Sequence, residues 1–458
     1  MNTLCRQLGL IACLALVTGC ASLQTPMAPA PQSINATGTP MAVTLSPPTA
    51  SPLSVATRVE PAFTSQPPPT AVATTGGAET LALVNGTLID GTGTAPLAGA
   101  VVVIRNGRIV GVGVRAAMPI PDGAQIIDVQ GATILPGFVN THVHRGYSEQ
   151  NLRAWAQAGV TTVRDLATSP APDTFAVRDA LRKDNRNARL VAAGPMLTVQ
   201  GGYPMVPWGM QGLVVASEQD AVVKVNQLLD DGANVIKIAL ESGSTFRRQI
   251  PVLSKAEAAA VVKTAHAHGV RVSAHVTSAE DLERVLDAGV DDIAHMPYDH
   301  VSDELIARIV KANMYWIPTL ELWQHVGVSD APIINNLRRF VAAGGQVALG
   351  TDYAGYAAQF ELGMPLSEMQ AMQEAGMTPM QIILSGTRNA ARVCNLDREL
   401  GTLQAGQVAD VLVVKGDPLQ DIRALASIHL VIHNGVVIQA GAQSRLAPRL
   451  VSLRQPGP

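Results

Sequence analysis

The sequence predicts an α/β protein, a (β/α)8 barrel of the TIM type with a small β-sandwich domain built from the segments that flank it. Three observations support this fold class. The middle of the chain alternates eight short apolar runs with longer helical patterns. Short β-rich runs with Asn-Gly turns lie at both ends of that middle part. No glycine-rich phosphate loop follows an early strand, which argues against the alternative of an open, doubly wound sheet.

The composition is that of an ordinary globular protein. The chain has 458 residues, of which 47% are hydrophobic and 15% charged, and this length allows one large domain plus a smaller one. The net charge is −3 and no long run of Lys or Arg occurs, so we expect no nucleic-acid partner.

The first 19 residues are expected to be a signal peptide. Arg6 precedes an apolar run that is too short for a permanent transmembrane helix. The segment ends in LVTGC, which resembles the bacterial lipoprotein signal, and this implies cleavage before Cys20 and lipid attachment to its thiol. Ala21 follows Cys20, and by the same resemblance it favours the outer membrane, facing the periplasm. The alternative is an ordinary secreted signal in which Cys20 is incidental.

Residues 20–78 predict an extended tether. They consist mainly of Pro, Ser, Thr and Ala with few charges, and such a segment cannot bury enough apolar surface to offset the entropy of ordering. Cleavage at Cys20 with lipid on its thiol would leave Cys394 as the one free thiol, so we expect no disulfide within the mature chain.

Residues 79–134 and 396–445 are expected to form the small β-domain. Asn106-Gly107 and Asn434-Gly435 each separate two β-rich runs, which is a hairpin signal. Because these runs lie at both ends, the part between them is predicted to be a single insertion. Residues 446–458 are left as a C-terminal tail.

Residues 135–395 are assigned to the barrel, although the apolar run that contains its first strand begins at Thr133. Two of the intervening helices are marked by a Ser at the expected N-cap and a Gly at the end, SKAEAAAVVKTAHAHG and SAEDLERVLDAG. The eight candidate strands are TILPGFVNTHV, GVTTVRDLA, ARLVAAGP, ANVIKIAL, VRVSAHV, DDIAHM, MYWIPTL and QVALGTDYA.

Side chains that can bind a metal recur where these strands end. In GFVNTHVHRG, His142 and His144 are one residue apart after an apolar run, and alternate residues of a strand face the same side. A buried Lys or Asp on a core strand is unfavourable unless it is paired or binds a metal. The further positions of this kind are Lys237, His275, His295 and Asp352.

This residue set suits a hydrolase with two divalent metal ions, with zinc as the default. Imidazoles and carboxylates are good ligands for Zn²⁺, although they also accept Mn, Co or Fe, and two ions about 3.5–4 Å apart can share a hydroxide. Burial lowers the pKa of Lys237, so its neutral amine could take up CO2 as a carbamate that bridges both ions.

The order HxH, Lys, His, His, Asp resembles the metal-dependent amidohydrolase superfamily, in the branch of imidazolonepropionase-like proteins and prolidase-type dipeptidases. The resemblance extends from Leu81 to about Gln439 and includes GTLQAGQVADVLVVKGDPL and TRNAARV. It implies that His142, His144 and Asp352 hold one metal, that carbamylated Lys237 bridges, and that His275 and His295 hold the second. It also implies that Asp352 transfers the proton from the hydroxide to the leaving group.

The expected activity is hydrolysis of a C–N amide bond, in a small peptide, an N-acyl amino acid or a cyclic amide. A lactonase or phosphotriesterase using the same site is an alternative within this chemistry, and a binding lipoprotein without catalysis is an alternative of another class. Two departures from the dipeptidase pattern argue against a prolidase: Ala239 stands where a tyrosine is common, and Gly201 to Pro204 read GGYP instead of GGHG.

Several other residues are weaker candidates. Tyr203 and Trp208, in a loop rich in Gly and aromatic residues, and Tyr298 and His300, after the strand of His295, could contact substrate. Packing of the loop against the barrel is the alternative. A homo-oligomer is also possible. Asp165 is expected to pair with Arg164 or a neighbour, with a role in the site as the alternative, and Arg247 and Arg248 are expected to be surface charges, with binding of a substrate carboxylate as the alternative. The residues expected to have surface or incidental roles are His266, His268, His325, His429 and His433.

Overall fold

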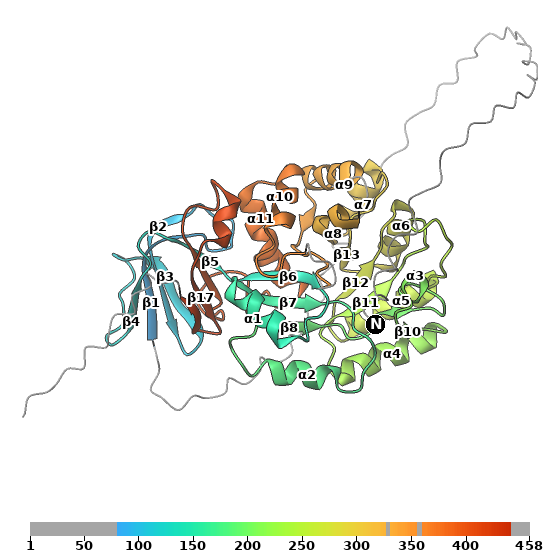
Figure 1. The fold of residues 1–458 in the computed structure, drawn as a ribbon, viewed down its shortest axis with the longest axis horizontal. Coiled ribbons are helices and arrows are strands. Elements are labelled where there is room, and N and C mark those ends of the chain that lie inside the picture. Colours follow the sequence, from blue (N-terminus) through green and yellow to red (C-terminus); the bar gives the residue numbers. More distant parts are fainter. Residues whose placement is uncertain (1–79, 327–329, 355–359, 441–458) are drawn as a thin grey trace, which may run out of the picture. The chain divides into compact units, whose positions relative to one another are not determined.

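The computed structural model describes residues 80–326, 330–354 and 360–440 (Figure 1). The predicted signal peptide, lipidated Cys20, tether and C-terminal tail lie outside the described residues. Within the described part of the chain, no helix is both long and apolar enough to cross a bilayer.

The eight predicted barrel strands are all present among the described residues and run parallel. They are β6 (Phe138–Val143), β7 (Val160–Asp165), β8 (Arg189–Ala192), β11 (Ile236–Ala239), β12 (Val272–His275), β13 (Asp292–Ala294), β14 (Tyr315–Ile317) and β15 (Gln346–Val347). One ladder joins β6, β7 and β8, and another joins β11 to β15 in order. The short β9 (Leu197–Thr198) pairs with β11, and β10 (Leu213–Val214) pairs with β9. The barrel fold is therefore confirmed.

Backbone hydrogen bonds close the barrel between the two ladders. The Asn234 N–H donates to the Ala192 carbonyl at 2.8 Å, which joins the end of β8 to the start of β11. On the other side, the Thr141 N–H donates to Leu349 at 2.8 Å and the Asp352 N–H donates to His142 at 2.9 Å. These bonds place the segment that follows β15 directly beside β6.

Helices follow the barrel strands and surround them (Figure 1). The two that were predicted from Ser and Gly signals begin as expected: Ser254 forms a capping box with Glu257, and the Ser278 side chain accepts from the Asp281 N–H. The helices are α1 (Glu149–Gln157), α2 (Thr174–Leu181), α3 (Met205–Trp208), α4 (Glu218–Asp231), α5 (Lys255–Ala267), α6 (Ala279–Ala288), α7 (Asp303–Lys311), α8 (Leu320–Val326), α9 (Asp330–Ala342), α10 (Leu366–Glu374), α11 (Pro379–Gly386), α12 (Arg388–Val393) and the 3-10 helix η1 (Ile422–Ala426).

Strands from both ends of the described chain form one further sheet, which we call the outer sheet; the domain that it forms is the outer domain. Its strands are β1 (Thr80–Leu88), β2 (Leu97–Arg105), β3 (Arg108–Val114), β4 (Gln125–Asp128), β5 (Thr133–Pro136), β16 (Val411–Val414), β17 (Ile428–His433) and β18 (Val436–Ala440). Their order is β18-β17-β16-β5-β1-β2-β3, and β4 also pairs with β1. Both Asn-Gly pairs adopt positive φ at both residues, as the predicted two-residue hairpin turns require.

The single run TILPGFVNTHV divides at Gly137 into two strands with different partners. β5 pairs with β16 in the outer sheet, whereas β6 pairs with β7 in the barrel. The chain thus passes from the outer sheet into the barrel at Gly137, which is two residues later than residue 135, the position expected from the sequence. A side chain at residue 137 would not fit, because its Cβ would lie 2.3 Å from the Thr161 hydroxyl.

The outer sheet is packed on both faces along its β5-β16-β17 part. Alternate residues face either a core inside this domain, such as Val411 and Val413, or the large barrel core, such as Leu412 and Val414. The two parts of the fold therefore share an apolar interior.

Candidate metal centre

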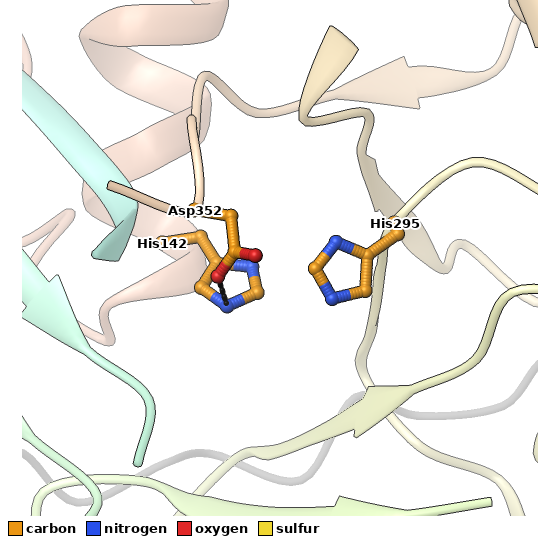
Figure 2. A group of neighbouring side chains, drawn as sticks. All are labelled: His142, His295 and Asp352. Carbon is orange, nitrogen blue, oxygen red and sulfur yellow. Dashed lines mark ion pairs between the residues drawn. The ribbon is translucent and has the colours of Figure 1, made fainter. Parts of the chain in front are cut away.

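Of the six predicted site residues, five lie at or just beyond the C-terminal ends of barrel strands, and Lys237 lies within its strand. His142 and His144 come from the end of β6, Lys237 from β11 and His275 from β12. His295 and Asp352 follow β13 and β15, and Figure 2 shows that both of them point toward His142. The strand ends of a barrel meet at one mouth, so residues separated by more than 200 positions become neighbours.

His295 and Asp352 have backbone conformations that are unusual for their residue types. Their φ angles are 86° and 61°, in the left-handed region that side chains with a Cβ disfavour. Such strain costs about 1–3 kcal/mol and is concentrated at functional sites, where the surrounding structure maintains it. Here the backbone of Asp352 is held by its hydrogen bond to the His142 carbonyl.

One carboxylate oxygen faces two imidazoles. Oδ1 of Asp352 lies 3.1 Å from Nε2 of His142 and 3.0 Å from Nε2 of His144. On the opposite side, Nε2 of His295 lies 3.0 Å from Nδ1 of His275. The two groups adjoin, because the ring centroids of His142 and His295 are 4.9 Å apart and ligand atoms of His142, His295 and Asp352 lie within 4.8 Å of one another.

Lys237 adds a buried amine to this cluster. Its side chain is 1% exposed and its Nζ has no hydrogen-bond partner among the described residues. Burial lowers the pKa of Lys237 to about 7, and the negative charge of Asp292 only partly opposes this shift. A large fraction of the amine is therefore neutral at pH 7, and its electrostatic influence extends to His142, His275 and His295.

Other contacts orient the imidazoles. Nδ1 of His144 lies 3.1 Å from the Ala167 carbonyl, and Nδ1 of His295 lies 2.8 Å from the Thr319 hydroxyl. These contacts leave the Nε2 atoms of both rings directed into the cluster. Such outer partners select the tautomer and the ring orientation of metal-binding histidines.

The ionisation states suit cation binding. Burial holds the pKa of His142 and of His275 well below the usual range and lowers that of His295 to about 4, so these rings are neutral and have lone pairs to donate. Burial would raise the pKa of Asp352, but the adjacent His142 and His144 outweigh it and hold this pKa well below its usual range. Burial would lower the pKa of His144, but its contact with Asp352 outweighs burial and raises this pKa. Three neutral imidazoles, the His144 ring, an ionised carboxylate and a partly neutral amine therefore converge, and this donor set fits divalent transition metals.

Asp165 was expected to pair with Arg164 or with a neighbour, and the structure does not pair it with Arg164. The Arg164 guanidinium donates two hydrogen bonds to Asp292, at 2.9 and 3.0 Å, and both side chains are fully buried. Asp165 instead accepts from the N–H groups of Gly146 and Ala167. Neighbouring residues of a strand face opposite sides, so these two side chains diverge.

Glu241 is a site residue that the sequence analysis missed. It is fully buried in the segment after β11, its Oε2 lies 3.9 Å from Nε2 of His275, and it hydrogen-bonds the Thr277 hydroxyl. Burial raises the pKa of Glu241. The sequence did contain a signal for this residue, because Glu241 is an acidic residue only four positions after Lys237 of β11.

The four weaker substrate candidates are placed differently. The ring of Tyr203 stacks on His275, and the Trp208 ring packs edge-on against Phe246. Tyr298 packs against the barrel core, and exposed His300 faces Arg339 of α9. The substrate role of these residues stays a prediction.

The remaining histidines have other partners. His266 and His268, at the end of α5, contact Asp291 and Asn226 respectively. His325 lies near Glu321, while His429 and His433 are buried in the outer domain. The two histidines of AHAHG thus contact different elements, as expected for alternate residues at a helix end.

Comparisons with known proteins agree with this architecture. The sequence model of the amidohydrolase family matches residues 133–438. The chain is 25% identical over 367 residues to an imidazolonepropionase of Symbiobacterium thermophilum, covering 70% of this chain and 84% of that one. It is 26% identical over 429 residues to an ochratoxinase of Aspergillus niger, covering 80% and 87%. The fold is similar to the crystal structure of a Xaa-Pro dipeptidase with bound methionine, with a TM-score of 0.68, 24% identity, and coverage of 78% and 99%.

Proposed function

The chain belongs to the amidohydrolase family, whose homologues are hydrolases acting on C–N bonds, and from this premise we propose that it is a metal-dependent hydrolase of an amide C–N bond in a small substrate. One observation carries the proposal. Asp352 faces His142 and His144 while His275 and His295 face each other next to them, so two sets of ligand atoms adjoin in one buried site.

We assign the ligands in two groups. His142, His144 and Asp352 would hold one divalent ion, with zinc as the default, and His275 and His295 would hold the second. Lys237 would serve both after its neutral amine adds to CO2 and releases a proton, since the resulting carbamate has two oxygens like a carboxylate. Bound ions would act as Lewis acids toward the scissile carbonyl and would ionise an attacking water near neutral pH.

Residues of the chain would transfer the proton during hydrolysis. Asp352 is ionised, so its carboxylate can accept a proton from the attacking water and then deliver it to the leaving nitrogen. The Thr319 hydroxyl and the Ala167 carbonyl would keep His295 and His144 in the tautomers that leave Nε2 free to bind.

Elemental analysis of the chain purified without chelator tests the metal centre. We expect about two equivalents of a divalent transition metal per chain, and removal by a chelator should abolish hydrolysis until metal is restored. Near zero metal, together with no hydrolysis after metal is added, would contradict the proposal and favour a binding protein.

A substrate panel tests the bond that is cleaved. The names of the relatives refer to different compounds, so family membership does not select a substrate. We expect turnover of amides among dipeptides, N-acyl amino acids and cyclic amides. Hydrolysis restricted to lactones, other esters or phosphotriesters would contradict the amide assignment.

We also propose that the enzyme is anchored by lipid at Cys20 to the outer membrane, facing the periplasm. The LVTGC motif and the Pro-rich segment that follows it support this location. Labelled palmitate should be incorporated by the wild type but not by Cys20→Ser, and the variant should leave the membrane fraction. Equal labelling of both proteins would rule out Cys20 as the attachment site.

A further inference from the structure

Three aromatic side chains form a chain of ring contacts that begins at His275 and ends at the exposed Trp208. Tyr203 and Trp208 belong to the segment between β9 and β10, where Trp208 is the last residue of the short α3, and Phe246 belongs to the loop after β11. We call these three residues the aromatic wall. Both loops leave the barrel at the end where the metal-binding side chains gather, which is the end that binds substrate in proteins of this architecture.

The wall is continuous with the metal centre. The Tyr203 ring lies nearly parallel to the His275 imidazole, with centroids 3.9 Å apart and planes inclined by 13°. The Phe246 ring lies nearly parallel to Tyr203 at 6.3 Å, and Trp208 meets Phe246 edge-on at 5.7 Å. A group bound against these rings would therefore lie next to a proposed metal ligand.

The outer end of the wall is open to solvent. Trp208 is 59% exposed, and Met210 beside it in the sequence is 49% exposed, whereas Tyr203 and Phe246 are partly buried. Large apolar side chains that are exposed near a polar site are typical of ligand-binding surfaces. Covering them would contribute roughly 25 cal/mol per Å² of apolar surface, and aromatic partners gain further stabilisation from stacking.

Close backbone packing holds both loops in place. A Cβ at Gly202 would lie 2.4 Å from the Thr198 hydroxyl and 3.0 Å from the Pro251 carbonyl. In the other loop, Gly243 has a φ of 90°, and a Cβ there would lie 1.9 Å from the Arg248 carbonyl. The Gly243 N–H also donates to Glu241. The wall is thus attached to the same buried network that contacts His275.

From these observations we infer that the aromatic wall is a specificity subsite that binds a planar aromatic group of the substrate and thereby places the amide bond at the metal centre. The inference rests on the proposed hydrolase function, because it takes the metal centre as the reacting end of the site. It names the substrate class as amides that carry an aromatic ring on the acyl or the amine side.

Binding measurements test the inference separately from turnover. We would arrest hydrolysis with Asp352→Asn and titrate the zinc-loaded protein calorimetrically with N-acetylglycine, N-benzoylglycine and N-acetylphenylalanine. At least one aromatic ligand should bind about tenfold more tightly than N-acetylglycine, which corresponds to about 1.4 kcal/mol. Trp208→Ala or Phe246→Leu should remove most of this preference and leave the affinity for N-acetylglycine within about twofold.

The exposed Val223 on α4 provides a matched control. It is 53% exposed, so Val223→Ala removes apolar surface outside the wall and should retain the preference. Equal affinities for all three ligands, no detectable binding of the aromatic ligands, or a preference unchanged by both wall variants would each overturn the inference. If the arrested protein shows the preference but the wild type hydrolyses no amide, the proposed function fails while the subsite stands.

Discussion

At the scale of single residues, Asp352 combines two tasks. It faces both histidines of β6 with one oxygen, and it is the carboxylate proposed to move the proton. Asp352→Asn should lower kcat by about 10²–10⁴-fold, the usual contribution of a general acid or base. Turnover, metal content and Tm should be measured together.

The exposed Asp303 provides the control for this variant. Its side chain is 91% exposed and pairs with Arg339 on the surface, so Asp303→Asn should leave kcat unchanged. A kcat for Asp352→Asn equal to that of the wild type would remove Asp352 from the proposed mechanism.

Glu241 is expected to act through His275 as a positioning residue. Because it lies near the ring nitrogen that faces away from His295, it can hold the His275 ring with Nδ1 directed to the metal. Glu241→Gln removes the carboxylate that lies 3.9 Å from this ring nitrogen, and metal affinity should fall by up to about 10–100-fold, the range for changes around a metal-binding histidine. Competition with a fluorescent chelator measures this affinity.

A purely structural role for Glu241 would give another result. It would lower Tm while leaving the metal dissociation constant of the folded protein unchanged. Thr277→Val provides the matched comparison, since it removes the hydroxyl that hydrogen-bonds Glu241 and should weaken metal binding in the same direction.

At the scale of elements, the two Asn-Gly turns of the outer sheet pack against each other. A Cβ on Gly435 would lie 2.4 Å from the Cα of Gly107, and the φ of Gly435 is 78°. Gly435→Ala should therefore combine left-handed strain of about 1–2 kcal/mol with a backbone clash, and we expect a total loss of about 2–4 kcal/mol. Urea unfolding measures this change.

Gly123 separates the two contributions. Its φ is 77°, but an added Cβ would meet no atom within 4 Å, so Gly123→Ala should show the strain alone. If both variants lose the same stability, the contact between the turns contributes nothing.

Helices α8 and α10 bring together two buried carboxyl groups. The Glu321 N–H donates to Glu368, and burial raises the pKa of Glu321 to about 7 and that of Glu368 to about 8. In the unfolded chain both would ionise near pH 4.3. The folded state thus binds more protons between about pH 4.5 and 8, and its stability should fall as pH rises through that range.

Glu368→Gln should flatten this pH dependence. Each unit of pKa shift corresponds to about 1.4 kcal/mol, so we expect the variant to gain roughly 2–4 kcal/mol relative to the wild type between pH 5 and pH 8. Unfolding of both metal-loaded proteins by urea at the two pH values provides the measurement. Parallel profiles would show that Glu368 is ionised throughout, and the exposed Glu280→Gln should follow the wild type.

At the scale of the whole molecule, a buried ion pair joins the barrel to the outer sheet. Arg189 of β8 donates to Asp410, which precedes β16, at 2.8 Å, and Arg189 also contacts Asn434. Arg189→Met would leave the Asp410 carboxylate buried without its cation, and such a loss typically costs about 3–5 kcal/mol. Because the two parts share an apolar core, calorimetry should still show one unfolding transition.

Arg186→Met is the matched control, since Arg186 is 64% exposed and should lose little stability. Two separate transitions in either protein would contradict the shared core.

Local patterns in the sequence were enough to predict the barrel and the order of the site residues along it. The period of the apolar runs, the Ser and Gly signals of the helices and the two Asn-Gly turns are local, and they were read correctly except that the first apolar run contains two strands. The residues that follow the strands could be assigned to one site, because the C-terminal ends of the parallel strands of any such barrel lie at the same end of the barrel.

Which of those side chains are in contact depends on the three-dimensional fold. It paired Arg164 with Asp292 across the barrel, placed Glu241 beside His275, and stacked Tyr203 on that imidazole. It also divided one apolar run at Gly137 between two sheets. These outcomes depend on the direction of each side chain and on residues far away in the chain, whereas a pattern within the sequence reports only the local periodicity and the burial that it implies.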